Sequence, residues 1–233
     1  MKKILTVICA LAIIATAVIA GFVMTGGDIG FLIKQGIQDK GSEVMGVPVT
    51  VENVDMPILT GIGKIENLII TNPQGEESDY TFKMGILNIE IDPETIKTEK
   101  VRIKKLIIDS PEISFEGDIK NNNIMQLQKN IQANKKDEKK KEKKVQLDYL
   151  KIQNGKLKLQ FKGLKSKTIT LADLELENIG SGGDTSISEM GQQIMRQFLK
   201  IITATLKKEM GGNIKKIKDK IKPPFKRPGP FGK

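Results

Sequence analysis

Residues 101–108 read VRIKKLII, and residues 145–152 read VQLDYLKI. Both segments carry apolar residues at their first, third, sixth and eighth positions, and the two are offset by 44 residues. The match continues at the same offset, where Ile113 and Phe115 correspond to Leu157 and Leu159. Alternation on both sides of a three-residue step is typical of a β-bulge, because the extra residue keeps the apolar set on one face. The sequence therefore predicts a bulged strand, a turn and a return strand that occur twice.

A weaker copy of the same spacing, with glycine in its first place, runs from Gly63 to Ile70. Repeats of this kind favour a unit that stacks on copies of itself. An antiparallel meander gives similar alternation without any repeat, so the pattern leaves both interpretations open. In either case we expect strands within residues 47–118 and 145–180, with one apolar face and one face in water.

Three segments of the exported part are expected to be helical. They are residues 26–46, a brief stretch from Asn123 onward, and residues 184–222. In the last of these, Ser186 and Glu189 fit a capping box, and the apolar residues that follow recur at spacings of three and four. The predicted fold class is α+β, with an N-terminal transmembrane helix, an antiparallel bulged β-sheet forming a curved groove, and a C-terminal amphipathic helix.

The chain is expected to divide into five parts. These are a membrane anchor or signal peptide (1–25), a short helix (26–46), a β-rich domain (47–183), an amphipathic helix (184–222) and a disordered basic tail (223–233). Within the β-rich domain, residues 135–144 read KKDEKKKEKK and contain nothing apolar. Such a block is usually solvated, so we interpret it as a Lys-rich insertion.

The N-terminus decides the compartment. Two lysines precede Ile4–Met24, a run of 21 residues without a charge. A helix of that length spans about 30 Å, the thickness of a bilayer core, and the lysines keep its start in the cytoplasm. The alternative is a cleaved signal peptide, whose apolar region is normally about 7–15 residues long. We favour a single-pass anchor with the N-terminus in the cytoplasm and the bulk of the chain exported, and we interpret Cys9 as an inert thiol inside the membrane.

Composition excludes several classes of function. The 233 residues include no His, no Trp and one Cys, and aromatic residues make up only 4%. Imidazole bases, His-ligated metals, thiolate zinc sites and aromatic surfaces for stacking bases are therefore ruled out or improbable. The carboxylates of Glu76, Glu77 and Asp79 fit a solvated turn, and Gly61-x-Gly63 lacks the third glycine of a phosphate loop. We expect no enzyme, no metal and no cofactor.

Most of the formal net charge of +10 lies at the C-terminus, where residues 206–233 contain ten Lys or Arg and two acidic residues. Isoleucines recur among these lysines at helical spacing. A basic amphipathic helix commonly lies on an anionic membrane, although plain solvation explains the charge equally well. Export behind the anchor argues against nucleic acid as a partner. The candidate membrane-surface residues are Lys215, Lys216, Lys218, Lys220 and Lys222.

The order of these segments resembles a known family. The apolar anchor, Gly41–Thr50, Gly61–Pro73, Phe82–Gly85 and Val101–Ile113 are similar to the N-terminal region of AsmA-like proteins, including DUF748-type members. The resemblance covers roughly residues 1–180. It implies an inner-membrane anchor, a periplasmic β-rich groove and a role in envelope lipid homeostasis. Larger relatives resemble bridge-like lipid transfer proteins, whose grooved sheets carry phospholipid acyl chains.

The resemblance turns the repeated apolar residues into candidates for a lipid groove. They are Val101, Ile103, Leu106, Ile108, Val145, Leu147, Leu150 and Ile152. The same residues would be ordinary core if the C-terminal helix covers the sheet, and the pattern alone does not distinguish the two. The alternative function is a structural adaptor of the envelope that binds a protein partner, or a second copy, through a sheet edge. With strands about 4.8 Å apart, a sheet this small is too short to cross a periplasm alone.

Overall fold

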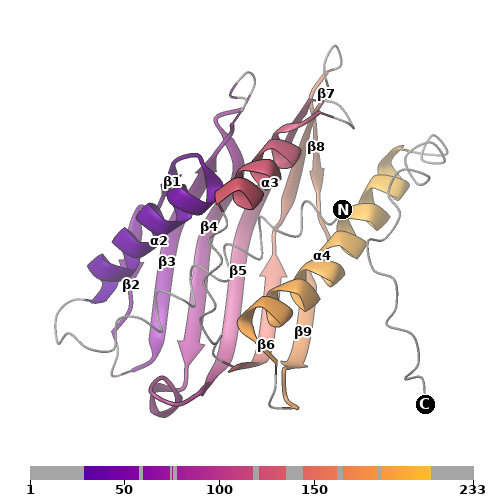
Figure 1. The fold of residues 1–233 in the computed structure, drawn as a ribbon. Helices are drawn as coiled ribbons and strands as arrows, with labels where there is room; N and C mark the ends of the chain where they lie inside the picture. Colours follow the sequence, from indigo (N-terminus) through magenta and orange to yellow (C-terminus); the bar gives the residue numbers. More distant parts are fainter. Residues whose placement is uncertain are drawn as a thin grey trace, which may run out of the picture.

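The computed structural model describes residues 29–57, 60–73, 75, 78–117, 121–134, 144–161, 165–182 and 185–210. This part of the chain has an α+β fold, in which three α-helices lie on one face of a sheet of nine strands (Figure 1). The helices are α2 (Ile29–Met45), α3 (Asn123–Asn134) and α4 (Ile187–Met210). The strands are β1 (Val49–Thr50), β2 (Asn53–Asp55), β3 (Ile62–Thr71), β4 (Tyr80–Ile91), β5 (Lys100–Gly117), β6 (Lys144–Gln153), β7 (Lys156–Phe161), β8 (Lys167–Thr170) and β9 (Leu174–Ile179).

The sheet is mixed, with the order β1-β3-β4-β5-β6-β9. Strand β2 continues the edge beyond β1, and β7 and β8 continue the sheet beside the C-terminal half of β5. Most pairs are antiparallel, but β5 is parallel to both β6 and β7. The expectation of a wholly antiparallel sheet is therefore wrong. Parallel neighbours need a long crossover, and residues 118–143, which include α3, form that connection.

The 44-residue repeat corresponds to this parallel pairing. Val101 lies opposite Val145, Ile103 opposite Leu147, Leu106 opposite Leu150 and Ile108 opposite Ile152. The same offset continues into β7, where Ile113 and Phe115 pair with Leu157 and Leu159. Equivalent positions of the two repeats are thus side by side in one sheet, so that their apolar side chains share a face.

A shift of register is found at one of the predicted bulges, on β5, whereas β6 keeps its register with β5 and β9, and β3 keeps its register with β4 up to Ile70. Against β4, the pairing of β5 shifts so that Glu90 faces Lys105 while Ile91 faces Ile103, which leaves Lys104 as the extra residue. In the weaker copy on β3, Asn67 has a φ of 49° within the three-residue step. Asparagine tolerates this left-handed conformation better than most residues do. The apolar set therefore stays on one face past each irregularity.

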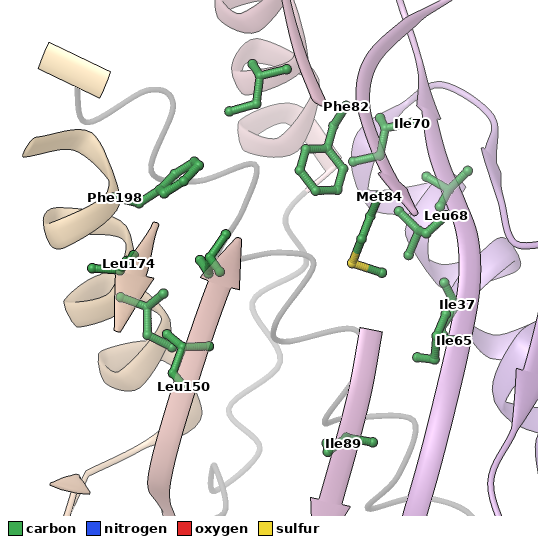
Figure 2. Close-up of a cluster of buried hydrophobic side chains, with 14 of the residues drawn as sticks. Ile37, Ile65, Leu68, Ile70, Phe82, Met84, Ile89, Leu150, Leu174 and Phe198 are labelled. Carbon is green, nitrogen blue, oxygen red and sulfur yellow. The ribbon is translucent and has the colours of Figure 1, made fainter. Parts of the chain in front are cut away.

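The helices cover that apolar face. The predicted helices at 26–46, Asn123 onward and 184–222 correspond to α2, α3 and the described part of α4. The capping box is confirmed, because Glu189 N donates to Ser186 Oγ at 3.2 Å and Ser186 N donates to the Glu189 carboxylate at 2.8 Å. Figure 2 shows two regions of the core, with Phe198 of α4 near Leu150 and Leu174, and Ile37 of α2 near β3.

Three predicted segments lie outside the described residues. They are the anchor (1–25), most of the Lys-rich insertion (135–143) and the chain after α4 (211–233). In the part that the structure describes, no helix is both long and apolar enough to cross a membrane.

Candidate functional site

The eight predicted groove residues share the helix-bearing face, but they differ in exposure. Leu147 and Leu150 have 0% of their surface exposed, and three others are also buried: Ile103, Val145 and Ile152. Val101, Leu106 and Ile108 are only half-buried at the margin of the core. The predicted set therefore separates into a covered part, mostly on β6, and a more accessible part on β5.

Helix α4 explains the covered part. It packs on β6 and β9, and its buried residues include Met190, Ile194 and Phe198. Figure 2 shows Phe198 on the same side of the core as Leu150 and Leu174. Burying side chains of this size removes about 1.5–3 kcal/mol of unfavourable hydration each, so these contacts hold α4 on the sheet. On β6, the repeated residues are core.

The accessible part forms what we call the apolar strip: Leu87 of β4 with Val101, Leu106 and Ile108 of β5. Leu87 pairs directly with Ile108, and Leu106 lies between the buried Ile89 and Leu150. Helix α2 packs on β1 and β2, and α4 on β6 and β9, so that the strip lies between the two helices (Figure 1). The alternation of Leu87 with Ile89 and Ile91 predicts that Leu87 lies on this face. Leu87 is not part of the 44-residue repeat, so the repeat did not identify it as a candidate site residue.

The strip has the chemistry and the length to contact an acyl chain. Its four side chains are aliphatic, and each packs at its base against the buried core. Val101 and Ile108 lie about 23 Å apart along β5 at about 3.3 Å per residue, with the buried Ile103 between Val101 and Leu106. Acyl chains of one leaflet occupy about half of a 30 Å bilayer core, or about 15 Å. One acyl chain could therefore contact the accessible residues at both ends of the strip, with the buried Ile103 between them.

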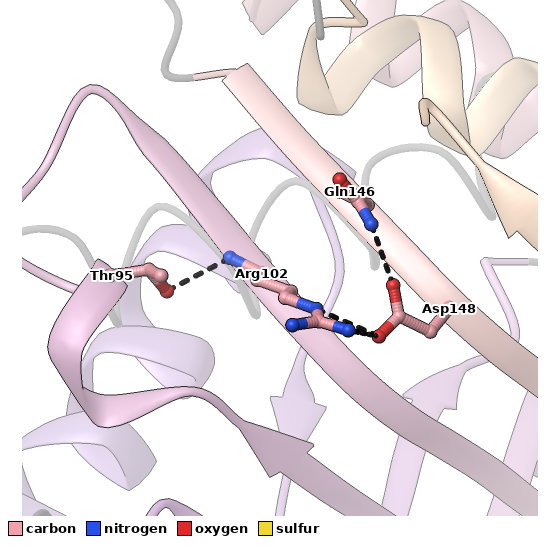
Figure 3. A network of polar contacts seen from close by, with 4 residues as sticks. All are labelled: Thr95, Arg102, Gln146 and Asp148. Atoms are coloured by element: carbon pink, nitrogen blue, oxygen red, sulfur yellow. Dashed lines mark hydrogen bonds and ion pairs between the residues drawn. The ribbon is translucent and has the colours of Figure 1, made fainter. Parts of the chain in front are cut away.

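The opposite face of the sheet is polar and is held by ion pairs between strands. The guanidinium of Arg102 on β5 contacts Asp148 on β6 at 2.8 Å, and Gln146 donates a hydrogen bond to the same carboxylate (Figure 3). The Arg102 backbone N–H donates to Thr95 Oγ1 at 2.9 Å. Because Arg102 is exposed, this pair contributes little stability, about 0–1 kcal/mol. Its arrangement reflects pairing of β5 with β6 rather than a reactive centre.

A cleft of about 310 Å³ crosses this polar face where the strands bend. It is lined by Glu66, Asn67, Gly85, Ile86, Asp109 and Ser110. Hydrogen bonds from Asn154, Gln153 and Ser110 lower the pKa of Asp109. These donors already satisfy the carboxylate, so we interpret the cleft as a consequence of the left-handed residues Asn67 and Ser110, with φ of 49° and 53°.

A buried polar network at the far end of the sheet was not predicted. The side chain of Asn123 accepts from Glu116 N at 3.0 Å and donates to Ser114 O at 2.8 Å, which continues the hydrogen bonding of β5 beyond its pairing with β4. The buried Glu116 carboxylate in turn accepts from Asn72 and from Ser78 N. The network fixes the β3–β4 loop and the start of α3. No local pattern identifies it, because its members are far apart in sequence.

The other residues that the sequence analysis considered do not add to this site. Lys215, Lys216, Lys218, Lys220 and Lys222 lie outside the described residues, as do Glu76 and Glu77, whereas Asp79 is exposed. A Cβ at Gly63 would lie 2.2 Å from Met56 Sδ, so a larger residue there requires the flexible Met56 side chain to move. Among the described residues, no three acidic or thiol side chains are grouped in a way that could hold a metal ion.

No protein-family model matches the chain, and no curated protein is significantly similar to it.

Proposed function

We propose that this chain is a non-enzymatic, inner-membrane-anchored periplasmic protein of envelope lipid homeostasis, which binds phospholipid acyl chains along the apolar strip. The proposal combines three features: an uncharged run of 21 residues at the N-terminus, an amphipathic sheet, and an apolar strip between helices. The resemblance to AsmA-like proteins supports the same function. Headgroups would remain in water while one acyl chain lies on the strip.

The observation that carries the proposal is the half-buried state of the strip. Leu87, Leu106 and Ile108 are adjacent on two neighbouring strands and remain half-buried, whereas α4 packs on β6 and β9. Soluble proteins usually cover such contiguous aliphatic surface or use it for binding. A lipid is the partner that the aliphatic character and the length of the strip favour.

The alternative, an adaptor that adds a strand at a sheet edge, has weaker support. On one edge, β1 and β2 are short and interrupted by Val51 and Glu52. On the other, β9 carries exposed Glu175 and Glu177, and Asn178 has a φ of 55°. Short, charged and irregular edge strands are the features by which natural sheets avoid adding another strand.

The test is photo-crosslinking with the full chain in its membrane. A photoreactive side chain is placed at Leu106, on the apolar face, or at Ile107, the adjacent residue on the polar face. Mass spectrometry then identifies what is attached after irradiation. The proposal expects a phospholipid adduct at 106 that is at least ten times more abundant than at 107.

A second pair of variants provides the matched control. Leu87→Asp places a charge on the strip, whereas Ile86→Asp places it on the opposite face of the same strand. The lipid adduct at 106 should disappear in the first and persist in the second, with circular dichroism showing that both are folded. Equal adducts at 106 and 107 would refute lipid binding, and a protein adduct at 106 would favour the adaptor.

A further inference from the structure

Two large apolar side chains of the described residues are exposed to solvent. Phe31, in the first turn of α2, has 64% of its surface exposed, and Ile62, the first residue of β3, has 60%. Other apolar residues on the same elements, such as Ile33 and Ile65, are buried. The helix-bearing core therefore does not use Phe31 or Ile62.

Both residues lie at one corner of the molecule. Helix α2 packs along the edge strands, with Gly41 against Val49 of β1 and its beginning beside β2 (Figure 1). Strand β2 pairs with β3 up to Lys64, two residues from Ile62.

The chain itself connects this corner to the apolar N-terminal run. Only residues 25–28 separate Met24, the end of the uncharged run, from Ile29, the start of α2. The five Cα–Cα steps from Met24 to Ile29 span at most about 18 Å when fully extended. If Ile4–Met24 crosses the bilayer, the start of α2 must therefore lie within about 18 Å of the membrane surface.

We propose that this corner, formed by Phe31 in the first turn of α2 and Ile62 at the start of β3, docks on the lipid surface from which the chain emerges. The inference rests on the membrane anchoring in the proposed function, although not on lipid binding by the strip. It also orients the strip. Because β3 and β5 both run antiparallel to β4, the Val101 end of β5 lies at the same end of the sheet as Ile62. Docking thus places one end of the strip toward the bilayer.

The absence of tryptophan from the chain makes the test direct. Three full-length variants each carry a single tryptophan: F31W, I62W and, as the control, T168W. Thr168 is exposed on β8, which lies beside the opposite end of β5 through β7. The variants are reconstituted into phosphatidylethanolamine and phosphatidylglycerol vesicles, with and without brominated acyl chains, and circular dichroism checks their fold.

Docking predicts that bromine quenches F31W and I62W at least threefold more than T168W, with blue-shifted emission. Quenching no greater than that of T168W, in protein that floats with the vesicles, would overturn the docked corner and leave the anchoring intact. Failure to float would overturn the anchoring and the inference with it. A blue shift that depends on protein concentration and not on bromine would assign the corner to a second copy and would also overturn it.

Discussion

Replacing Asn123 with alanine tests the buried network that joins α3 to β5. Asn123 has 0% of its surface exposed, and its amide makes hydrogen bonds with Ser114 O, Glu116 N, Ile124 N and Thr81 Oγ1. The substitution leaves a buried carbonyl and a buried N–H of β5 without their partner. Each such group costs about 1–3 kcal/mol, so the expected loss of unfolding free energy is about 3 kcal/mol or more.

The assay is thermal and urea unfolding of the full chain in detergent, followed by circular dichroism. For a chain of this size, about 3 kcal/mol corresponds to a decrease in Tm of about 6–12 °C. Asn134→Ala, at the exposed last position of α3, is the matched control and should change stability by less than about 0.5 kcal/mol.

Asn123→Asp separates the network from simple helix capping. Aspartate is favourable in the first turn of a helix, so a capping role alone predicts stability close to that of the unsubstituted protein. In the network, a carboxylate oxygen would face Ser114 O in place of the donating amide, and the loss should match that of Asn123→Ala. A loss below about 1 kcal/mol for both variants would refute the reasoning.

Four further predictions concern other parts of the fold. Burial and the hydrogen bond to Glu112 raise the pKa of Tyr80 to about 12. Absorbance titration of the Tyr149→Phe variant, in which Tyr80 is the one remaining tyrosine, should give that value. Adding Glu112→Gln should lower the pKa of Tyr80. The hydrogen bond from Tyr80 also lowers the pKa of Glu112 below its ordinary 4.5. The ionised carboxylate therefore stabilises the fold above that pH, and this stabilisation is lost on acidification. Between about pH 7 and about pH 3, the Glu112→Gln variant should lose less free energy of unfolding than the unsubstituted protein. Gly61→Ala should destabilise by about 1–3 kcal/mol in urea unfolding, because φ is 67° and a Cβ would lie 2.1 Å from a carbonyl oxygen of β4, whereas an unchanged midpoint would contradict that geometry. Ser186→Ala should lower the free energy of unfolding by about 1 kcal/mol, because it removes the cap of α4. Glu189→Gln should cost no more than a substitution at an exposed site, because glutamine retains the geometry of the cap.

Much of the local structure could be predicted because it is encoded by periodicity and caps. The spacing of Val101, Ile103, Leu106 and Ile108 specified both the strand and its bulge, since an apolar set can remain on one face only if the extra residue is absorbed there. The start of α4 at Ser186 followed from its capping pair for a similar reason, because the two side chains satisfy nearby backbone groups.

The parallel pairing of β5 and β6 was missed although its signal was present. Two copies that run in the same direction along the chain, separated by a helix, are the pattern of a parallel pair with a crossover. The alternation of apolar residues is also compatible with an antiparallel sheet, which is the prediction that the parallel pairing overturns. Asn123 was missed for another reason: its partners on β5 become its neighbours only after the chain has folded.

The sequence by itself determined which residues are strand, which are helix, and which side chains form one apolar face, since these depend on spacing along the chain. Only the tertiary structure decided which part of that face is covered. Leu150 and Leu106 occupy equivalent places in the repeat, yet α4 packs over Leu150 while Leu106 remains half-buried. Coverage depends on where a helix from a distant part of the chain finds its best packing, and no local pattern carries that information.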